Sequence, residues 1–81
     1  METRIAVIGI VVEDENSVEA LNEILHEYRH TIIGRMGIPY REKGISLISV
    51  ALDAPQPVIS ALSGKLGMLP GVSTKTLYSK T

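Results

Sequence analysis

Two stretches of the chain are apolar on both of the faces that a β-strand would present. They are residues 4–12, RIAVIGIVV, and residues 45–54, ISLISVALDA, and both are rich in β-branched residues. Because side chains alternate across a sheet, the first stretch carries two apolar rows: Ala6, Ile8, Ile10 and Val12 on one face, and Ile5, Val7 and Val11 on the other. Strands of this kind belong at the centre of a sheet whose two faces are both covered. This requirement limits the possible folds more than any other feature of the sequence.

A helix is expected directly after the first strand. The polar residues EDENS end the apolar run, and Asn16 or Ser17 can cap a helix by accepting a hydrogen bond from its first backbone N–H groups. Apolar residues then recur at the 3.6-residue spacing of an amphipathic helix, at Val18, Leu21, Ile24, Leu25 and Tyr28. The pattern stops near Arg29 or His30, where we expect the helix to end.

The second half of the chain predicts a hairpin, a helix and a last strand. Residues 31–40 form an extended run, and the turn REKG joins them to the apolar stretch that follows, with Gly44 able to adopt a positive φ. Pro39 lacks a backbone N–H, so we expect its strand to lie at an edge of the sheet. A second helix should follow and end near Gly67, and the alternating residues 72–80 predict the last strand.

The resulting order βαββαβ predicts a ferredoxin-like α+β sandwich, a four-stranded antiparallel sheet with two helices on one face, formed by residues 1–81 as a single domain. The two apolar stretches are the central strands of that topology. Two helices cover only one face, so the second apolar face predicts contact with another subunit in a homo-oligomer, either a dimer or a tetramer. The alternative is a monomer in which long side chains of the edge strands shade that face.

Composition excludes several classes of protein. The 81 residues contain no cysteine, which rules out disulfides, thiolate metal sites and a cysteine nucleophile. Eight Lys and Arg against nine Asp and Glu give a formal net charge of -1, without the basic excess of a protein that binds nucleic acid directly. The longest apolar run, residues 5–12, is too short to span a membrane and no signal peptide precedes it. We therefore expect a cytoplasmic protein with no membrane partner.

Residues 26–30 read HEYRH and match the H-E-x-x-H pattern of zinc peptidases. The helical phase nevertheless puts His26 and His30 opposite the apolar stripe, among glutamates, where there is no walled cleft for a catalytic metal. The pattern is therefore typical of a surface helix. An alternative is that the two histidines bind a divalent metal together with a ligand from a second subunit.

The hairpin carries the other candidate site. Arg35, Tyr40 and Arg41 cluster around it, and two cations with a tyrosine suit an anionic ligand or a partner protein. The alternative is an ordinary solvated hairpin with a glycine bulge. No set of residues for nucleophilic or acid–base catalysis emerges, so we expect neither an enzyme nor a cofactor.

Four segments, RIAVIGIVVED, LNEILHEY, GRMGIPYREKGIS and ISALSGKLGMLPGV, resemble the small proteins known as iron-only hydrogenase system regulators. The resemblance covers nearly the whole chain. It implies a ferredoxin-like fold akin to amino-acid-binding ACT domains and to the regulatory domain of nickel-responsive repressors, together with a regulatory role.

The relation to nickel repressors does not extend to their metal site. Their regulatory domain uses a cysteine and histidines on strands, whereas this chain has no cysteine and both histidines follow the first predicted strand within the helical segment. The chain also begins with its first strand, so we expect no preceding DNA-binding segment. A regulator of this form would act through a partner protein.

These observations together predict a cytoplasmic, homo-oligomeric, ACT-like regulatory module that binds a small effector or a partner protein and has no catalysis of its own. Its link to an iron-only hydrogenase system, and to transcription, follows from the resemblance. One alternative is a metal-binding sensor that uses His26 and His30 at a subunit interface. The other is a purely structural assembly subunit without a ligand.

Overall fold

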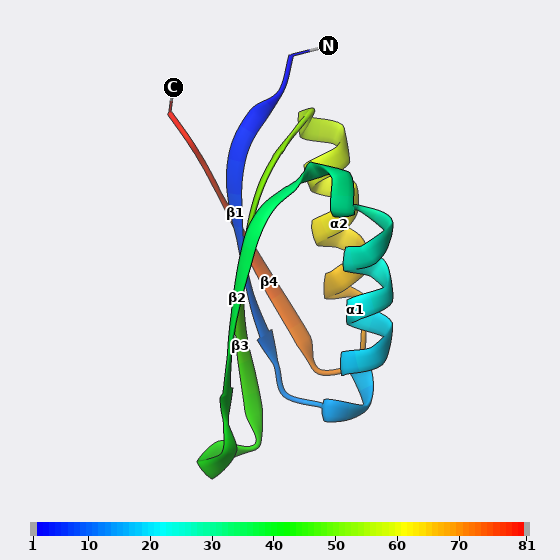
Figure 1. Ribbon diagram of the computed structural model, residues 1–81. Helices are drawn as coiled ribbons and strands as arrows, with labels where there is room; N and C mark the ends of the chain where they lie inside the picture. Colours follow the sequence, from blue (N-terminus) through cyan, green and yellow to red (C-terminus); the bar gives the residue numbers. More distant parts are fainter. Residues whose placement is uncertain (1, 81) are drawn as a thin grey trace.

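The computed structural model describes residues 2–80, in which a four-stranded antiparallel sheet packs one face against two helices (Figure 1). In chain order the elements are β1 (Arg4–Val12), η1 (Glu15–Ser17), α1 (Val18–Glu27), η2 (Arg29–Thr31), β2 (Ile32–Tyr40), η3 (Arg41–Lys43), β3 (Ile45–Ala54), α2 (Gln56–Gly67) and β4 (Val72–Tyr78), where η denotes a single turn of 3-10 helix. The strand order is β2-β3-β1-β4. The predicted ferredoxin-like α+β fold is confirmed, with the two doubly apolar strands at the centre and the proline-containing strand at an edge.

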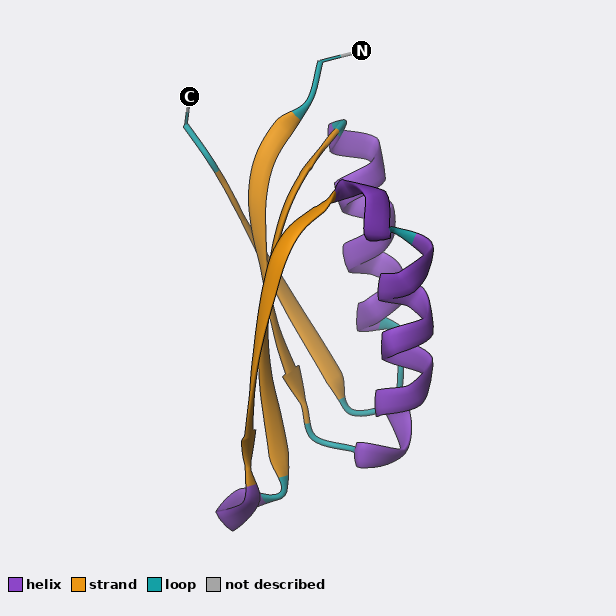
Figure 2. Cartoon of the chain, viewed as in Figure 1, coloured by secondary structure: helices purple, strands orange, loops and turns teal. Residues whose placement is uncertain are grey.

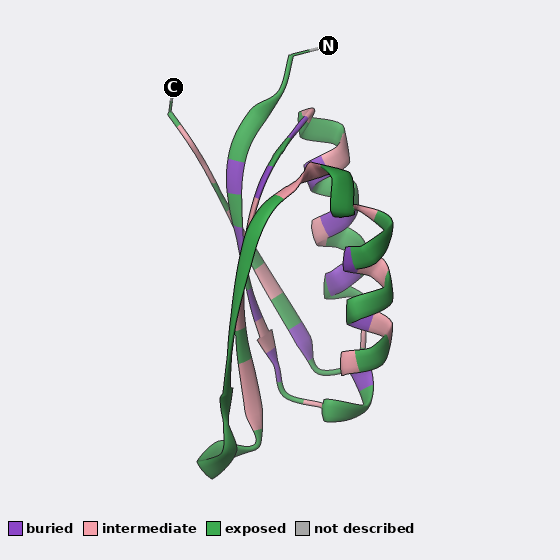
Figure 3. Cartoon of the chain, viewed as in Figure 1, coloured by how far each residue is buried: buried purple, intermediate pink, exposed green. Residues whose placement is uncertain are grey.

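The hydrophobic core lies between the sheet and the helices, and Figure 3 shows its buried segments on the facing sides of both layers. Its residues come from five of the six main elements: Ala6, Ile8, Ile10 and Val12 of β1, Leu21 and Leu25 of α1, Val50, Leu52 and Ala54 of β3, Ile59, Leu62 and Leu66 of α2, and Val72 of β4. Each fully buried Leu or Ile contributes about 1.5–3 kcal/mol relative to an exposed one. The structure thus shows that the row of Ala6, Ile8, Ile10 and Val12 is the one that faces the helices, a choice that the sequence left open.

Polar side chains on the helix-facing side of β4 find partners in α2. The hydroxyls of Ser63 and Thr74 are 3.1 Å apart, and the Thr76 hydroxyl donates to Ser63 Oγ at 3.4 Å. Half-buried hydroxyls without such partners would cost free energy because they lose their hydrogen bonds to water. The alternating threonines of β4 are therefore compatible with the covered face.

The first helix starts where the sequence predicts, with Ser17 at its N-cap position, but the predicted capping hydrogen bond is absent from the described residues. Asp14 caps the η1 turn, since its side chain accepts from the backbone N–H of Asn16 at 2.9 Å. Ser17 makes no side-chain cap; its hydroxyl instead donates to the carbonyl oxygen of Pro70 at 2.6 Å. The serine thus joins the beginning of α1 to the loop before β4, a contact that no local pattern indicates.

The same junction constrains Gly71. Its φ is +70°, and a Cβ atom there would lie 2.7 Å from the Cβ of Asp14. Its carbonyl oxygen accepts a hydrogen bond from the Glu13 N–H at 2.7 Å. Glycine is needed here both for the left-handed backbone and for the close approach of the two loops.

Short helical turns lie between several of the main helices and strands (Figure 2). α1 ends at Glu27, earlier than the predicted end near Arg29 or His30, and the η2 turn follows. The β2–β3 connection is a hairpin, as predicted, with Gly44 in the left-handed conformation at φ +64°. None of the helices within residues 2–80 combines the length and the apolar character needed to cross a membrane.

Candidate functional site: the open face of the sheet

The sheet face that points away from the helices, here called the open face, is largely apolar. The alternation of β1 puts Ile5, Val7 and Val11 on it, opposite the core residues. Its exposed large apolar residues are Ile5, Val7, Met36, Ile38, Tyr40, Leu47 and Leu77, with Met36 at 71% and Leu77 at 73% exposure. In Figure 1 the sheet is seen nearly edge-on, and both long helices lie on the opposite side. The structure of residues 2–80 therefore leaves an apolar surface uncovered.

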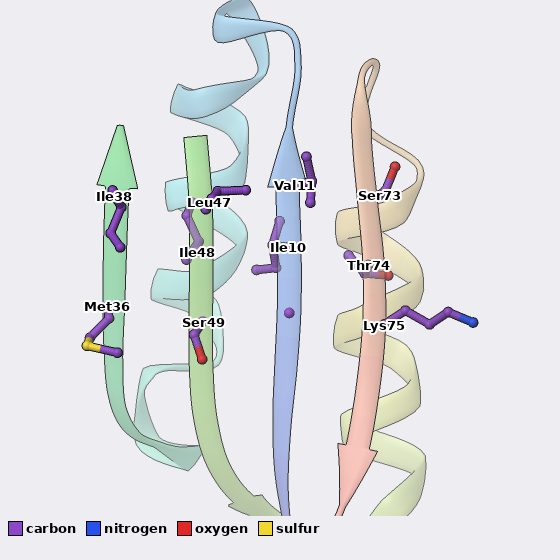
Figure 4. Close-up of a pocket in the computed structure, with 11 residues that line it drawn as sticks. Ile10, Val11, Met36, Ile38, Leu47, Ile48, Ser49, Ser73, Thr74 and Lys75 are labelled. Atoms are coloured by element: carbon purple, nitrogen blue, oxygen red, sulfur yellow. The ribbon is translucent and has the colours of Figure 1, made fainter. Parts of the chain in front are cut away.

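Small residues occupy the middle of the open face. The strand register aligns Met36, Ser49, Gly9 and Lys75 in one row across all four strands. Apolar side chains rise on both sides of this row, Leu47 and Val11 on one side, and Ala51 and Val7 on the other. Because Gly9 and Ser49 are short, the row forms a depression of about 420 Å³ (Figure 4). The nearest atom to a Cβ built on Gly9 would be the Lys75 carbonyl oxygen at 3.9 Å, so the depression has room for another group.

Few charges interrupt the open face. Among the residues of the four strands, Asp53 and Lys75 are the charged ones whose register places them there. In Figure 4 the Lys75 side chain extends away from β1, past β4. Within the described part of the chain, neither Lys75 nor the hydroxyls of Ser49 and Ser73 have an ion-pair or hydrogen-bond partner. The face thus combines a large apolar area with polar groups that remain available.

The predicted hairpin residues do not share one surface. Arg35 is paired with Val50 of the core row and donates to the Asn22 side chain of α1 at 3.1 Å, so it lies on the helix side. Tyr40 is paired with Ile45 on the open face, and its hydroxyl donates to Glu42 at 3.3 Å. Arg41 lies in the η3 turn at the hairpin tip. A single ligand contacting all three would have to wrap around the edge formed by β2.

A β-bulge explains where Arg35 lies. Ile32 is paired with Leu52 and Gly34 with Ala51, so one extra residue of β2, Ile33, interrupts the pairing. Such a bulge reverses the alternation beyond it and redirects side chains. Without the bulge, Ile32 and Arg35 would point to opposite faces; with it, both lie on the helix side, and Met36 and Ile38 join the open face.

Beside the bulge, α1 and β2 enclose a second depression of about 320 Å³, here called the α1–β2 hollow. It brings together Arg35 and His26, which belonged to two separate predictions, and adds Arg29. Asn22, Leu25, Ile32, Ile33 and Gly34 complete its lining. The hollow is therefore basic at its rim and apolar along its wall.

The two histidines are exposed, as the helical phase predicts, but they belong to different segments. His26 lies in α1, whereas His30 lies in the η2 turn beyond the end of the helix. No group of three or more His, Cys, Asp or Glu side chains within residues 2–80 is arranged to hold a metal ion. A metal at these histidines would need a ligand from another molecule, so the metal site stays a prediction.

Sequence reasoning missed Ser49, Lys75 and Arg29. A signal for the first was present, since a glycine and serines interrupt two otherwise apolar central strands, which indicates a thin place on one face. Lys75 becomes relevant only through the register of β4 against β1. Arg29 joins Arg35 only because α1 packs beside the bulge.

Comparison with known proteins finds a family and relatives that are named as regulators. The model of a family described as "TM1266-like: Iron-only hydrogenase system regulator, putative" matches residues 4–76. A protein of Saccharolobus solfataricus named "Putative nickel-responsive regulator" is 33% identical over 80 residues, which cover 93% of this chain and 59% of that protein. A protein of the same name from Saccharolobus islandicus is 29% identical with the same coverage. The chain thus spans 59% of the length of these relatives.

Solved structures show the same fold. The uncharacterized protein TM1266 from Thermotoga maritima matches with a TM-score of 0.93 and 39% identity, covering 98% of this chain and 100% of that one. A formyltetrahydrofolate deformylase from Pseudomonas putida KT2440 matches with a TM-score of 0.68 at 13% identity, covering 95% of this chain and 29% of the enzyme. At that identity the second match shows the fold alone.

Proposed function

The chain belongs to the TM1266-like family of iron-only hydrogenase system regulators, and from this premise we propose that it is a cytoplasmic regulatory module that pairs with a second copy through its open face. In this proposal it binds a small effector or a partner protein and passes the signal on without catalysis. The names of the family and of the curated relatives indicate regulation. The hydrogenase system is the proposed target, and the partner protein would carry any contact with nucleic acid.

The observation that carries the proposal is the uncovered apolar face. Exposed apolar patches of this extent on small proteins usually mark an interface. Four strands about 4.8 Å apart and about 30 Å long give a flat area of roughly 600 Å². Side-chain relief increases this area toward the roughly 800 Å² that each partner buries in a stable complex. The open face is therefore large enough for a symmetric dimer.

The charge distribution agrees with self-association. An interface between two copies related by a two-fold axis brings the same surface into contact with itself. A face rich in one sign of charge would repel its copy, whereas the open face carries one basic and one acidic side chain, Lys75 and Asp53, over its paired strands. Projecting residues such as Met36 and Leu77 would contact the depression at the centre of the partner's open face.

The test is the oligomeric state of the full chain at about 10 μM, measured by light scattering after size-exclusion chromatography. We expect a dimer or a larger species for the unaltered protein. Leu47→Lys places a charge on the open face and should give a folded monomer, with its secondary structure checked by circular dichroism. Ala61→Lys, on the exposed side of α2, is the matched control and should leave the oligomer intact. A monomeric unaltered protein would refute the pairing.

A further inference from the structure

We propose that the α1–β2 hollow binds a small organic carboxylate with an apolar body. The site rests on the proposed function, because it would be the effector site of the regulatory module. It lies on the helix side of the sheet, so binding there leaves the open face free. Its volume of about 320 Å³ is at the lower end of the range for small-molecule sites.

The cations of the hollow are unpaired. Arg29 and Arg35 both line it, and neither forms an ion pair within the described residues. Each guanidinium uses a single hydrogen bond to the protein, Arg29 to the His26 carbonyl oxygen at 3.0 Å and Arg35 to the Asn22 side chain at 3.1 Å. An arginine has five N–H donors, so most donors of both side chains are available to a ligand.

These hydrogen bonds also hold the guanidiniums in place. Both acceptors belong to α1, so both guanidiniums are attached to the same helix beside the hollow while the two residues stay exposed. The bulge in β2 turns Arg35 toward the helix side. Pre-positioned guanidinium groups lose less rotamer entropy on binding and form planar, two-point contacts with a carboxylate.

The wall and the helix end favour a carboxylate over a phosphate. Leu25, Ile32 and Ile33 give the hollow an apolar side, and Ile33 is 63% exposed. The hollow lies at the C-terminal half of α1, where backbone carbonyls carry partial negative charge and oppose a doubly charged anion. This opposition is weaker for a singly charged carboxylate, and no carboxylate side chain lines the hollow to add to it.

The test uses two-dimensional amide NMR of the ¹⁵N-labelled full chain, titrated with 3-methylbutanoate. We expect saturable shifts confined to residues 22–35. Replacing Arg35 or Arg29 with alanine should weaken binding about tenfold or more, because each replacement removes charge-assisted hydrogen bonds to the ligand. Arg41→Ala, which removes the same charge at the hairpin tip, is the matched control and should change the affinity less than twofold.

Parallel titrations separate the possible results. The amine 3-methylbutylamine has the same apolar body with the opposite charge and should not bind. Stronger binding of inorganic phosphate than of 3-methylbutanoate would overturn the assignment to a carboxylate. Absence of binding by any probe, or equal loss on Arg41→Ala, would overturn the site itself. The oligomeric state of the same samples is measured alongside, so failure of the anion site is distinguished from failure of the proposed pairing.

Discussion

The two faces of the sheet are built from the same four strands, but the helices cover only one of them. On the helix side, Ile8, Val50 and Leu52 are fully buried by α1 and α2. On the open face, their neighbours Val7 and Leu47 are 37% and 41% exposed. Apolar alternation alone therefore does not distinguish a core face from an uncovered one. What distinguishes them is whether the same chain supplies a covering layer.

The largest effect should follow from removing a side chain of the covered face. Leu52→Ala leaves a cavity at a fully buried position, and we expect a loss of about 2–5 kcal/mol in the free energy of unfolding. Leu47→Ala on the open face should cost less than half of that. Urea denaturation at several protein concentrations measures both variants, because a loss that depends on concentration reports association. Equal, concentration-independent losses would contradict the distinction between the faces.

A glycine at the contact between the β1–η1 and α2–β4 loops gives the next prediction. Gly71→Ala introduces a Cβ at a positive φ and against Asp14, 2.7 Å away, so we expect a loss of about 2–3 kcal/mol. Gly44 has a similar φ at the free hairpin tip, but nothing lies within 4 Å of its Cβ position. Gly44→Ala should therefore cost about 1 kcal/mol, and comparison of the two thermal midpoints isolates the steric part.

The centre of the open face should tolerate an added methyl group. Gly9 has no positive φ and lies at the floor of the depression. Gly9→Ala should stabilise the folded chain by less than about 1 kcal/mol, mainly by restricting the unfolded state. Denaturation of the variant at low concentration tests this. A large destabilisation would mean that the face is already filled within one chain.

The smallest effect concerns the outer surface of the helix layer. The Tyr28 side chain, and then the Glu27 carboxylate 3.7 Å away, raise the pKa of Lys65 above its usual 10.5. A raised pKa in the folded state stabilises the fold fully below the unfolded value and loses this contribution as the pH rises through the folded value. Thermal midpoints should therefore fall slightly more for the unaltered protein than for Lys65→Met as the pH rises above 10.5, through the folded pKa. Because Lys65 is exposed, salt should reduce the difference.

Much of the fold could be predicted from local patterns. The doubly apolar residues 4–12, the helical spacing after Val18 and the turn at Gly44 gave the element order, the central strands and the edge strand. The same phase argument correctly placed His26 on the exposed side of α1, whereas His30 is exposed in the η2 turn beyond the helix. These features depend on periodicity and backbone preferences, which neighbouring residues already contain.

The candidate sites depended on contacts between distant segments. The bulge at Ile33 decides which side of the sheet Arg35 and Met36 occupy, and strict alternation along β2 would have placed them wrongly. The Ser17 hydroxyl donates to the Pro70 carbonyl oxygen instead of capping its own helix, because the loop before β4 lies beside it.

Strand alternation, helix phase and the hairpin turn thus follow from the local sequence. Register, the convergence of Arg29 with Arg35 and the row through Gly9 were decided by tertiary structure, because they require strands and helices far apart in the chain to pack together.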